Sequence, residues 1–311
     1  MSSRKAQLPQ DAAMVSVQNI PSGKMKKRSS PKKAAAFCTV FVLMALTIWT
    51  VWGNTALMVS TVAISNSRIP PAFSGFRIAQ VSDLHNAEFG KDNSTLLRML
   101  SESEPDMIVI TGDLVDSAHT DIDTALAFAT EAVRIAPVYY VTGNHEARLT
   151  EYNRLRNSLE TAGVTVLEDQ TVWLERDGEK ILLIGLSDPN FAVKGDMFGE
   201  TPSMVGATLK SLTGSESSYT ILLSHRPELF ETYVDCGIGL VLSGHAHGGQ
   251  FRLPFIGGLV APNQGLFPKY DAGLYTDGST DMVVSRGIGN SIIPLRFNNR
   301  PEIVLVELCA E

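Results

Sequence analysis

Cysteine and histidine are both scarce in this sequence of 311 residues. The three cysteines are too few for a disulfide framework, and no Cys-x-x-Cys pair indicates a zinc ribbon or a redox motif. Basic residues are also outnumbered, because 26 Lys and Arg stand against 33 Asp and Glu, a formal charge of −7. This balance excludes a generally basic nucleic-acid-binding protein, so no nucleic acid partner is expected. With 44% hydrophobic residues the chain is not a disordered one, and its length suffices for a full core.

The net charge is distributed unevenly along the chain. Residues 1–33 contain eight basic residues and one acid, whereas the remainder contains 18 basic and 32 acidic residues. The first segment therefore carries +7 and the rest −14. We expect residues 1–33 to form a basic, disordered tail.

A run without charged residues follows this tail, from residue 34 to residue 52. Its length of about 19 residues approaches the ~20 needed to cross a ~30 Å hydrocarbon layer. Trp49 and Trp52 at its far end are typical of an interfacial aromatic belt. A buried core helix is the weaker alternative, because the run is apolar on every face. A cleaved signal peptide is a closer one, but the run is longer than a usual signal core and no clear small-x-small cleavage site follows it.

We therefore predict a single-pass transmembrane anchor at residues 34–53. The positive-inside rule then keeps the tail in the cytoplasm and places everything after about Gly53 on the extracytoplasmic side of the cell membrane. Nothing in the sequence indicates an oligomeric state.

Beyond the anchor, strand and helix patterns alternate, which predicts an α/β domain at residues 54–311 with more than one sheet. Predicted strands cover residues 57–64, 76–82, 107–111, 138–142, 219–223 and 238–242. Predicted helices cover residues 94–104, 121–135, 151–162 and 202–212. A turn at Asp177-Gly178 predicts a hairpin over 172–186, and strands and loops should dominate residues 251–308.

A polar cluster follows each of five apolar strands. The clusters are Asp83-Leu-His85, Gly112-Asp113, Gly143-Asn144-His145-Glu146, Ser224-His225 and Gly244-His245-Ala-His247. In open α/β sheets, ligands bind beyond the carboxyl ends of the strands. Two Asp, one Asn and five of the six histidines are therefore expected around one crevice. The sixth, His119, is expected in a solvated loop or at a helix start.

Imidazole and carboxylate together favour Zn, Fe or Mn as the bound metal. Asp-x-His and His-x-His place both side chains on one face of an extended segment, because side chains alternate with period two. Seven or eight ligands exceed the four of a structural zinc site. They suit two ions about 3.5–4 Å apart, bridged by one carboxylate.

The order of these clusters resembles that of the calcineurin-like metallophosphoesterase superfamily. The resemblance extends over about residues 76–247, and the segments 248–254 and 285–289 are similar to its membrane-anchored bacterial branch. It implies a metallophosphoesterase fold, a four-layer sandwich of two mixed β-sheets flanked by helices.

The resemblance also implies a role for each residue in a phosphoric ester hydrolase with two divalent metal ions (Mn, Zn or Fe). One metal is held by Asp83, His85 and His247, the second by Asn144, His225 and His245, and Asp113 bridges them. His145 binds no metal; it contacts the phosphate and protonates the leaving oxygen. Metal-activated hydroxide attacks the phosphorus of a phosphodiester, phosphomonoester or pyrophosphate.

Other polar residues near the clusters have open roles. Glu146 stands where many members have Asp, and we expect it to orient a histidine or its loop. Asp116 is either a similar support or a helix N-cap. Arg226 and Arg286 are candidates for contacts with phosphate oxygens, and a surface position is an equal alternative for each.

The substrate is the least determined property. The apolar segment 251–267 is either core or a wall that contacts lipid. The second alternative favours a lipid-linked or nucleotide-lipid substrate, and relatives of the implied branch include hydrolases of UDP-diacylglucosamine. A catalytically inactive binding scaffold is the main alternative function, although such proteins usually lack a ligand and this chain keeps all eight residues. A two-metal hydrolase of a peptide or lactam is a third.

Overall fold

The computed structural model of the protein describes residues 31–193, 200–214, 218–290 and 294–311. The chain divides into two compact units, residues 1–45 and 46–311. Most of the predicted tail, residues 1–30, lies outside the described residues.

Helix α1 (Pro31–Thr55) contains the uncharged run. Its segment Ala35–Thr55 has a mean hydropathy of 2.0 and is long and apolar enough to cross a membrane, by length and composition. None of its most hydrophobic window is buried within the protein. This removes the core-helix alternative for residues 34–53.

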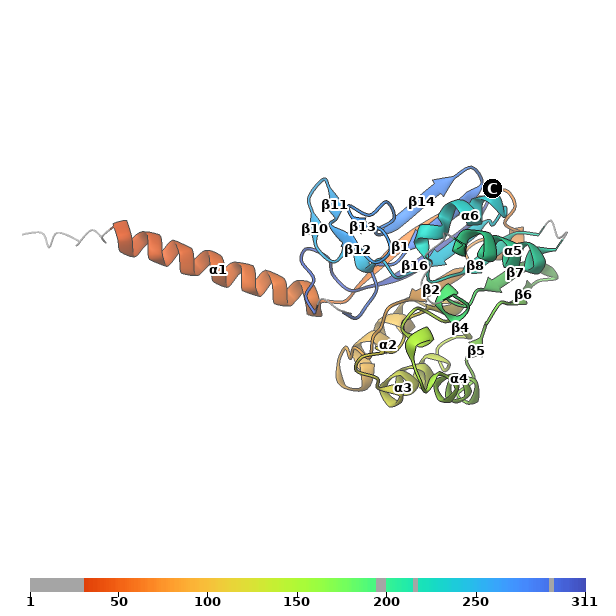
Figure 1. The fold of residues 1–311 in the computed structure, drawn as a ribbon, viewed down its shortest axis with the longest axis horizontal. Coiled ribbons are helices and arrows are strands. Elements are labelled where there is room, and N and C mark those ends of the chain that lie inside the picture. Colours follow the sequence, from red (N-terminus) through yellow and green to blue (C-terminus); the bar gives the residue numbers. More distant parts are fainter. Residues whose placement is uncertain (1–30, 194–199, 215–217, 291–293) are drawn as a thin grey trace, which may run out of the picture. The chain divides into compact units, whose positions relative to one another are not determined.

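Two six-stranded mixed sheets form the centre of the second unit (Figure 1). The strands of the first sheet, in spatial order, are β1 (Met58–Asn66), β16 (Glu302–Ala310), β2 (Arg77–Val81), β3 (Met107–Thr111), β4 (Val138–Val141) and β5 (Thr165–Val166). Those of the second are β14 (Gly273–Asp277), β15 (Thr280–Val284), β9 (Leu240–Ser243), β8 (Thr220–Leu223), β7 (Glu179–Gly185) and β6 (Gln170–Arg176).

Helices cover the outer face of each sheet. Side chains of α2 (Ser94–Glu102), α3 (Ile122–Ala132) and α4 (Tyr152–Thr161) form one core with the first sheet. Those of α5 (Thr201–Thr213) and α6 (Phe230–Asp235) form another with the second sheet. A third core lies between the two sheets. The predicted four-layer sandwich is confirmed.

Strand β3 shows how the sequence places these layers. Its side chains alternate in direction, as in any strand. Ile108 and Ile110 pack in the core shared with the helices, whereas Met107 and Val109 pack in the core between the sheets. Both faces are buried, which explains why the run is apolar without alternation.

The carboxyl ends of the site-bearing strands lie at common edges because these strands are parallel. Strands β2, β3 and β4 pair in parallel, as do β7, β8 and β9. Each predicted polar cluster follows one of these strands, so the topology brings the five clusters together.

Three features were not predicted from the sequence. Strand β16 pairs in parallel with β1 and antiparallel with β2, and so separates two strands that are consecutive in the chain. Helix α6 was missed. Residues 252–266 form two short hairpins, β10–β11 (Arg252–Leu253, Gly257–Gly258) and β12–β13 (Val260–Ala261, Gly265–Leu266).

Candidate metal centre

The eight predicted site residues lie close together, and each is at most 6% exposed. After the first sheet's strands come Asp83 and His85 (β2), Asp113 (β3), and Asn144 and His145 (β4). After the second sheet's strands come His225 (β8), and His245 and His247 (β9). His119, the remaining histidine, has a side chain that is 93% exposed.

One group of donor atoms gathers around His85 and His247. Their Nε2 atoms are 3.2 Å apart. Asp83 Oδ1 lies 3.3 Å from His247 Nε2, and Asp113 Oδ2 lies 3.6 Å from His85 Nε2. These four residues can each offer one ligand atom to a common cation.

A second group shares the same oxygen of Asp113. His225 Nε2 is 3.3 Å from Asp113 Oδ2, and His245 Nδ1 is 3.2 Å from His225 Nε2. Within the described residues, the buried Oδ1 of Asn144 has no hydrogen-bond partner. A buried acceptor that lacks a partner is costly unless a ligand satisfies it.

The charge state of these groups suits a divalent cation. Burial, only partly opposed by nearby carboxylates, lowers the pKa of His85 to about 4 and that of His247 to about 3. Both imidazoles are therefore neutral at pH 7 and keep a lone pair for a metal. Burial raises the pKa of Asp113, but the charge of His225 outweighs it and holds that pKa well below its usual range. His225 differs, because burial lowers its pKa but the charge of Asp113 outweighs burial and raises the pKa of His225 to about 10. A divalent cation would take the place of that proton, and a carboxylate oxygen with imidazole nitrogens is a donor set that fits Zn, Fe or Mn.

The backbone at this centre is strained in a way that points to function. Five of the residues have a positive φ, a conformation uncommon outside glycine. They are Asp83 (52°), His85 (46°), Asp113 (50°), His245 (67°) and His247 (47°). Such strain persists where the surrounding structure enforces it, typically at functional sites. Gly244, just before His245, has room for no side chain, because a Cβ there would overlap Ser82 and Asp83.

His145 is held at the edge of the centre by its Nδ1 atom. The backbone N–H of Ser117 donates to Nδ1 at 3.0 Å. This hydrogen bond makes Nδ1 an acceptor, so the proton of the neutral ring is on Nε2. Asp116 Oδ2 lies 3.7 Å from the same Nδ1 and 3.6 Å from His85 Nδ1. Asp116 is therefore a support of this region, and its N-cap alternative is wrong, since Asp121 caps α3 by accepting from the N–H of Thr124.

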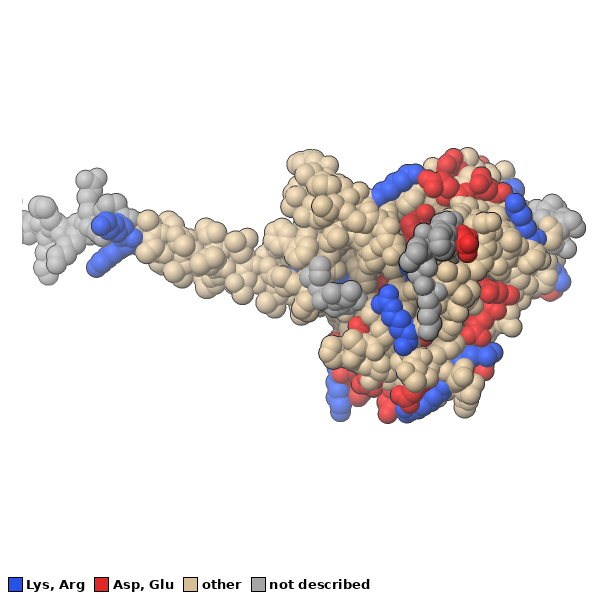
Figure 2. Space-filling model, in the orientation of Figure 1, with Lys and Arg blue, Asp and Glu red and all other residues tan. Residues whose placement is uncertain are grey.

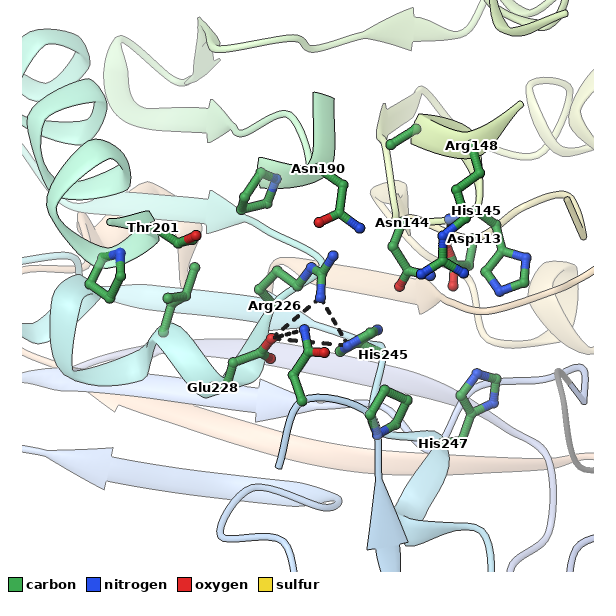
Figure 3. A pocket seen from close by; sticks show the side chains of 16 residues that line it. Asp113, Asn144, His145, Arg148, Asn190, Thr201, Arg226, Glu228, His245 and His247 are labelled. Carbon is green, nitrogen blue, oxygen red and sulfur yellow. Dashed lines mark hydrogen bonds and ion pairs between the residues drawn. The ribbon is translucent and has the colours of Figure 1, made fainter. Parts of the chain in front are cut away.

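A cavity of about 1090 Å³ opens beside these residues (Figure 3). Asp113, Asn144, His145, His245 and His247 line one side of it. Its other walls include Arg148, Asn190, Arg226, Glu228 and the loop at Pro262-Asn263. Side chains that follow strands of both sheets thus line one cavity.

Comparison with known proteins agrees with this geometry. The sequence profile described as calcineurin-like phosphoesterase matches residues 76–249, more than half of the chain. The chain belongs to the calcineurin-like phosphoesterase family. It is accordingly a metal-dependent phosphoester hydrolase, and its buried His/Asp cluster is compatible with a divalent metal centre.

Three relatives illustrate the range of the family. An uncharacterized metallophosphoesterase of Bacillus subtilis, YkuE, is 36% identical over 79% of this chain and 83% of its own. The phosphodiesterase YaeI of Escherichia coli is 31% identical over 75% of this chain and 82% of its own. A bovine transmembrane protein with a metallophosphoesterase domain is 31% identical over 81% of this chain and 57% of its own.

Arg226 of this phosphoesterase is buried, so the predicted alternative of a surface position is wrong for it. The side chain is 4% exposed and forms a two-point ion pair with Asp188, with Nη2 to Oδ1 at 2.8 Å. Its Nη1 lies 3.1 Å from His245 Nε2 (Figure 3). Arg286 differs: it is partly exposed beside Glu302 and does not line the cavity. Asp188 was missed because residues 181–186 were interpreted only as one arm of a hairpin, whereas β7 also pairs in parallel with β8 and ends at the same sheet edge.

Arg296 is a second buried cation that sequence reasoning missed. It is fully buried and donates to the carbonyl oxygens of Arg286 and Gly289, at 2.7 and 2.5 Å. Its Nη2 lies 3.4 Å from His247 Nδ1, the ring nitrogen on the side away from the donor cluster. A guanidinium has only N–H donors, so Arg296 cannot accept a ring N–H from His247. It fixes the position of the ring by lying against it.

Glu146 ties together the loops that follow β3 and β4. Its Oε2 accepts the N–H groups of Asp113 and Gly143 at 2.9 and 2.7 Å, and its Oε1 accepts those of Leu114 and Val115 at 2.8 and 3.2 Å. Burial and then the charge of Asp113 raise the pKa of Glu146 to about 7, against the effect of these donors. Glu146 thus orients the loop, as predicted.

We expect Glu146→Gln to destabilise the fold by about 2–4 kcal/mol, because an amide NH₂ replaces one acceptor and leaves buried N–H groups unpaired. Denaturant unfolding of EDTA-treated protein measures this loss without the contribution of bound metal. The matched control, Glu104→Gln, removes a carboxylate that is 82% exposed and should stay within about 0.5 kcal/mol of the wild type. Equal stability of Glu146→Gln and Glu104→Gln would show that the four hydrogen bonds do not organise the loops.

Proposed function

We propose that this protein is a membrane-anchored phosphoesterase with two metal ions, and that it acts on a lipid-linked or nucleotide-lipid phosphodiester or pyrophosphate. The observation that carries the proposal is the sharing of one buried oxygen, Asp113 Oδ2, by two donor groups at the wall of an open cavity. A single site would not require the second group.

The two donor groups define the ligands of this proposal. Asp83, His85 and His247 would hold one ion, Asn144, His225 and His245 would hold the other, and Asp113 would be shared between them. Divalent ions bound there supply Lewis acidity and lower the pKa of a bound water toward neutrality. Mn, Fe and Zn all accept this mixture of imidazole and carboxylate.

The side chains around the centre supply the remaining chemistry. His145 presents its Nε2–H to the cavity, since Ser117 donates to Nδ1. As the acid it acts in the imidazolium form, which transfers the Nε2 proton to the leaving oxygen and returns to the neutral ring, and Ser117 Oγ, 3.1 Å from Nδ1, is placed to accept the second ring N–H. Arg226 lies at the cavity wall beside His245, where Asp188 and Glu228 Oε1, at 3.4 Å, balance its charge.

The preference for a diester or pyrophosphate attached to a lipid has three supports. The cavity is large and open enough for a phosphate with substituents on both sides. A relative that matches most of the chain bears the name phosphodiesterase. Helix α1 has the length and composition of a membrane span, and another relative is named a transmembrane protein.

The same reasoning gives the placement in the cell. Residues 34–53 span the membrane, residues 1–33 remain in the cytoplasm, and the catalytic domain, residues 54–311, lies outside it. The inactive-scaffold alternative is disfavoured, because all eight residues converge on the cavity wall or on one another.

A metal analysis with a substrate panel tests the proposal. The purified full chain should contain about two metal ions, and it should hydrolyse a lipid-linked pyrophosphate or nucleotide-lipid in vesicles faster than p-nitrophenyl phosphate. Turnover of soluble phosphoesters alone, with none on lipid vesicles, would reject the lipid-linked substrate. Full metal content without turnover of any phosphoester would favour the scaffold.

A further inference from the structure

The two short hairpins after the last histidines expose apolar side chains on one part of the catalytic unit. The exposed fractions are 37% for Leu253, 108% for Phe255, 58% for Ile256, 74% for Leu266 and 65% for Phe267. We call these five residues the hairpin patch. They show that the core-packing alternative for segment 251–267 is wrong at these positions. A cluster of exposed apolar residues of this kind marks an interaction surface.

The hairpin patch carries no charge of its own. No Asp, Glu, Lys or Arg occurs between Arg252 and Lys269. The region of β10–β13 is accordingly uncoloured in the space-filling view, whereas red and blue side chains are spread over the rest of the visible catalytic unit (Figure 2). An uncharged apolar surface suits a hydrocarbon environment better than a water-exposed or polar protein partner.

The base of the first hairpin is joined to the segment that receives the end of helix α1. The Arg252 N–H donates to the Phe297 carbonyl at 3.0 Å, and Phe251 pairs with Phe297 in a parallel bridge. The neighbouring residue, Arg296, exchanges two hydrogen bonds with Asn54 of the helix, each 2.8 Å long. The hairpins are therefore built on the residues that fasten the end of α1.

A second contact holds the helix end in the same place. Arg300 stacks over the ring of Trp52, 4.6 Å from its centroid, and donates to the carbonyls of Ala56 and Leu57 at 2.7 and 3.0 Å. Trp52 is a residue type that favours the membrane interface. If α1 crosses a bilayer, these contacts of Arg300 keep the hairpin patch near the membrane–water interface.

The second hairpin connects the patch to the cavity. Pro262 and Asn263, in the turn between β12 and β13, line the cavity, while Leu266 and Phe267 on β13 and just after it are exposed. The β12–β13 hairpin thus lines the cavity with its turn and exposes apolar side chains to solvent at its end.

We propose that the hairpin patch inserts into the surface of the lipid bilayer, as a membrane contact additional to helix α1. Insertion places the mouth of the cavity at the level of the lipid head groups, where the phosphate of a lipid-linked substrate lies. The inference rests on the membrane anchor of the proposed function and extends it, because a single helix leaves the catalytic unit free to turn about the helix axis, and a second contact removes that freedom.

The test uses the full chain in lipid nanodiscs, labelled with an environment-sensitive fluorophore at a single cysteine. The background is Cys38→Ser, Cys236→Ala and Cys309→Ala, and the label is attached at Phe255→Cys. The matched control carries the label at Ser279→Cys, an exposed residue in the turn after β14, which points away from β10–β13 (Figure 1).

We expect blue-shifted emission and quenching by spin-labelled lipids at position 255, and neither at position 279. Aqueous emission at both positions, in protein that co-purifies with the nanodisc, would overturn the proposal. A blue shift at position 255 that depends on protein concentration and is not quenched by the lipids would assign the patch to a second copy of the chain instead.

A double variant separates this inference from the proposed function. Phe255→Glu with Phe267→Glu should leave turnover of soluble bis-p-nitrophenyl phosphate unchanged, because neither residue lines the cavity. It should lower turnover of a lipid-linked substrate in nanodiscs at least about tenfold, the factor that one buried phenylalanine is worth. Equal loss on both substrates would contradict the inference. If the protein labelled at position 255 is quenched by the lipids while the wild type hydrolyses no phosphoester, the proposed function is rejected and the membrane contact is kept.

Discussion

Asp113→Asn is expected to abolish both metal loading and turnover. The Oδ2 atom of Asp113 lies 3.3–3.6 Å from imidazole nitrogens of the two donor groups, so one substitution removes the anionic oxygen from each of them. A neutral amide cannot bridge two cations as a carboxylate does. The fold should survive, because the amide oxygen of Asn can still accept the His145 N–H that Asp113 Oδ1 accepts at 2.8 Å.

Metal content by mass spectrometry and hydrolysis of bis-p-nitrophenyl phosphate measure this effect. Asp123→Asn is the matched control, since its carboxylate is 84% exposed and lies on helix α3. It should retain the metal content and rate of the wild type. Wild-type turnover by Asp113→Asn would show that the ligand assignment is wrong.

His145→Ala should keep the metals and lose about 10²–10⁴-fold in kcat, the usual contribution of a general acid. His145 lines the cavity, and its Nδ1 accepts a hydrogen bond from Ser117 and lies 3.7 Å from Asp116 Oδ2, outside the two groups that contain Asp113. The variant therefore separates binding of the metals from transfer of the proton.

The leaving group provides a sharper readout for His145. A p-nitrophenolate departs without a proton far more readily than an alkoxide does, so the deficit should be smaller for a nitrophenyl ester than for an alkyl ester. His119→Ala, at an exposed histidine, should behave as the wild type on both. Loss of both metals in His145→Ala, or an equal deficit for both esters, would contradict its role as an acid.

The polar clusters could be predicted from the sequence because each follows a short apolar strand directly. A strand that is buried on both faces is apolar throughout, as residues 107–111 are, and can be recognised in the sequence by this pattern. The residue that follows such a strand must lie at the edge of the sheet. Local pattern was therefore enough to place Asp113 and its counterparts. The hairpin at Asp177-Gly178 was readable for a similar reason, since both residues adopt the positive φ that its turn requires.

Long-range pairings could not be read in this way. The sequence of residues 302–310 does not indicate that this strand pairs between β1 and β2, because both partners are distant in the chain. Any other apolar strand could pair with β1 and β2 equally well. The burial of Arg226 depends on Asp188, 38 residues earlier, which no local pattern links to it. The exposure of Phe255 was equally hidden, because an apolar segment that faces lipid has the composition of one that faces a core.

The position of β16 has a consequence for the order in which this protein folds. The first sheet requires residues 302–310 between β1 and β2. Strand β2, which precedes Asp83 and His85, can pair with β3 earlier but lacks its other neighbouring strand until the ribosome has reached those residues. Contacts between such distant segments close slowly, since the entropy of a long loop is lost before the pairing is gained. Helix α1, by contrast, is local and is complete after the first 55 residues. The chain should therefore form its apolar helix early in synthesis and complete its catalytic sheet only at the end.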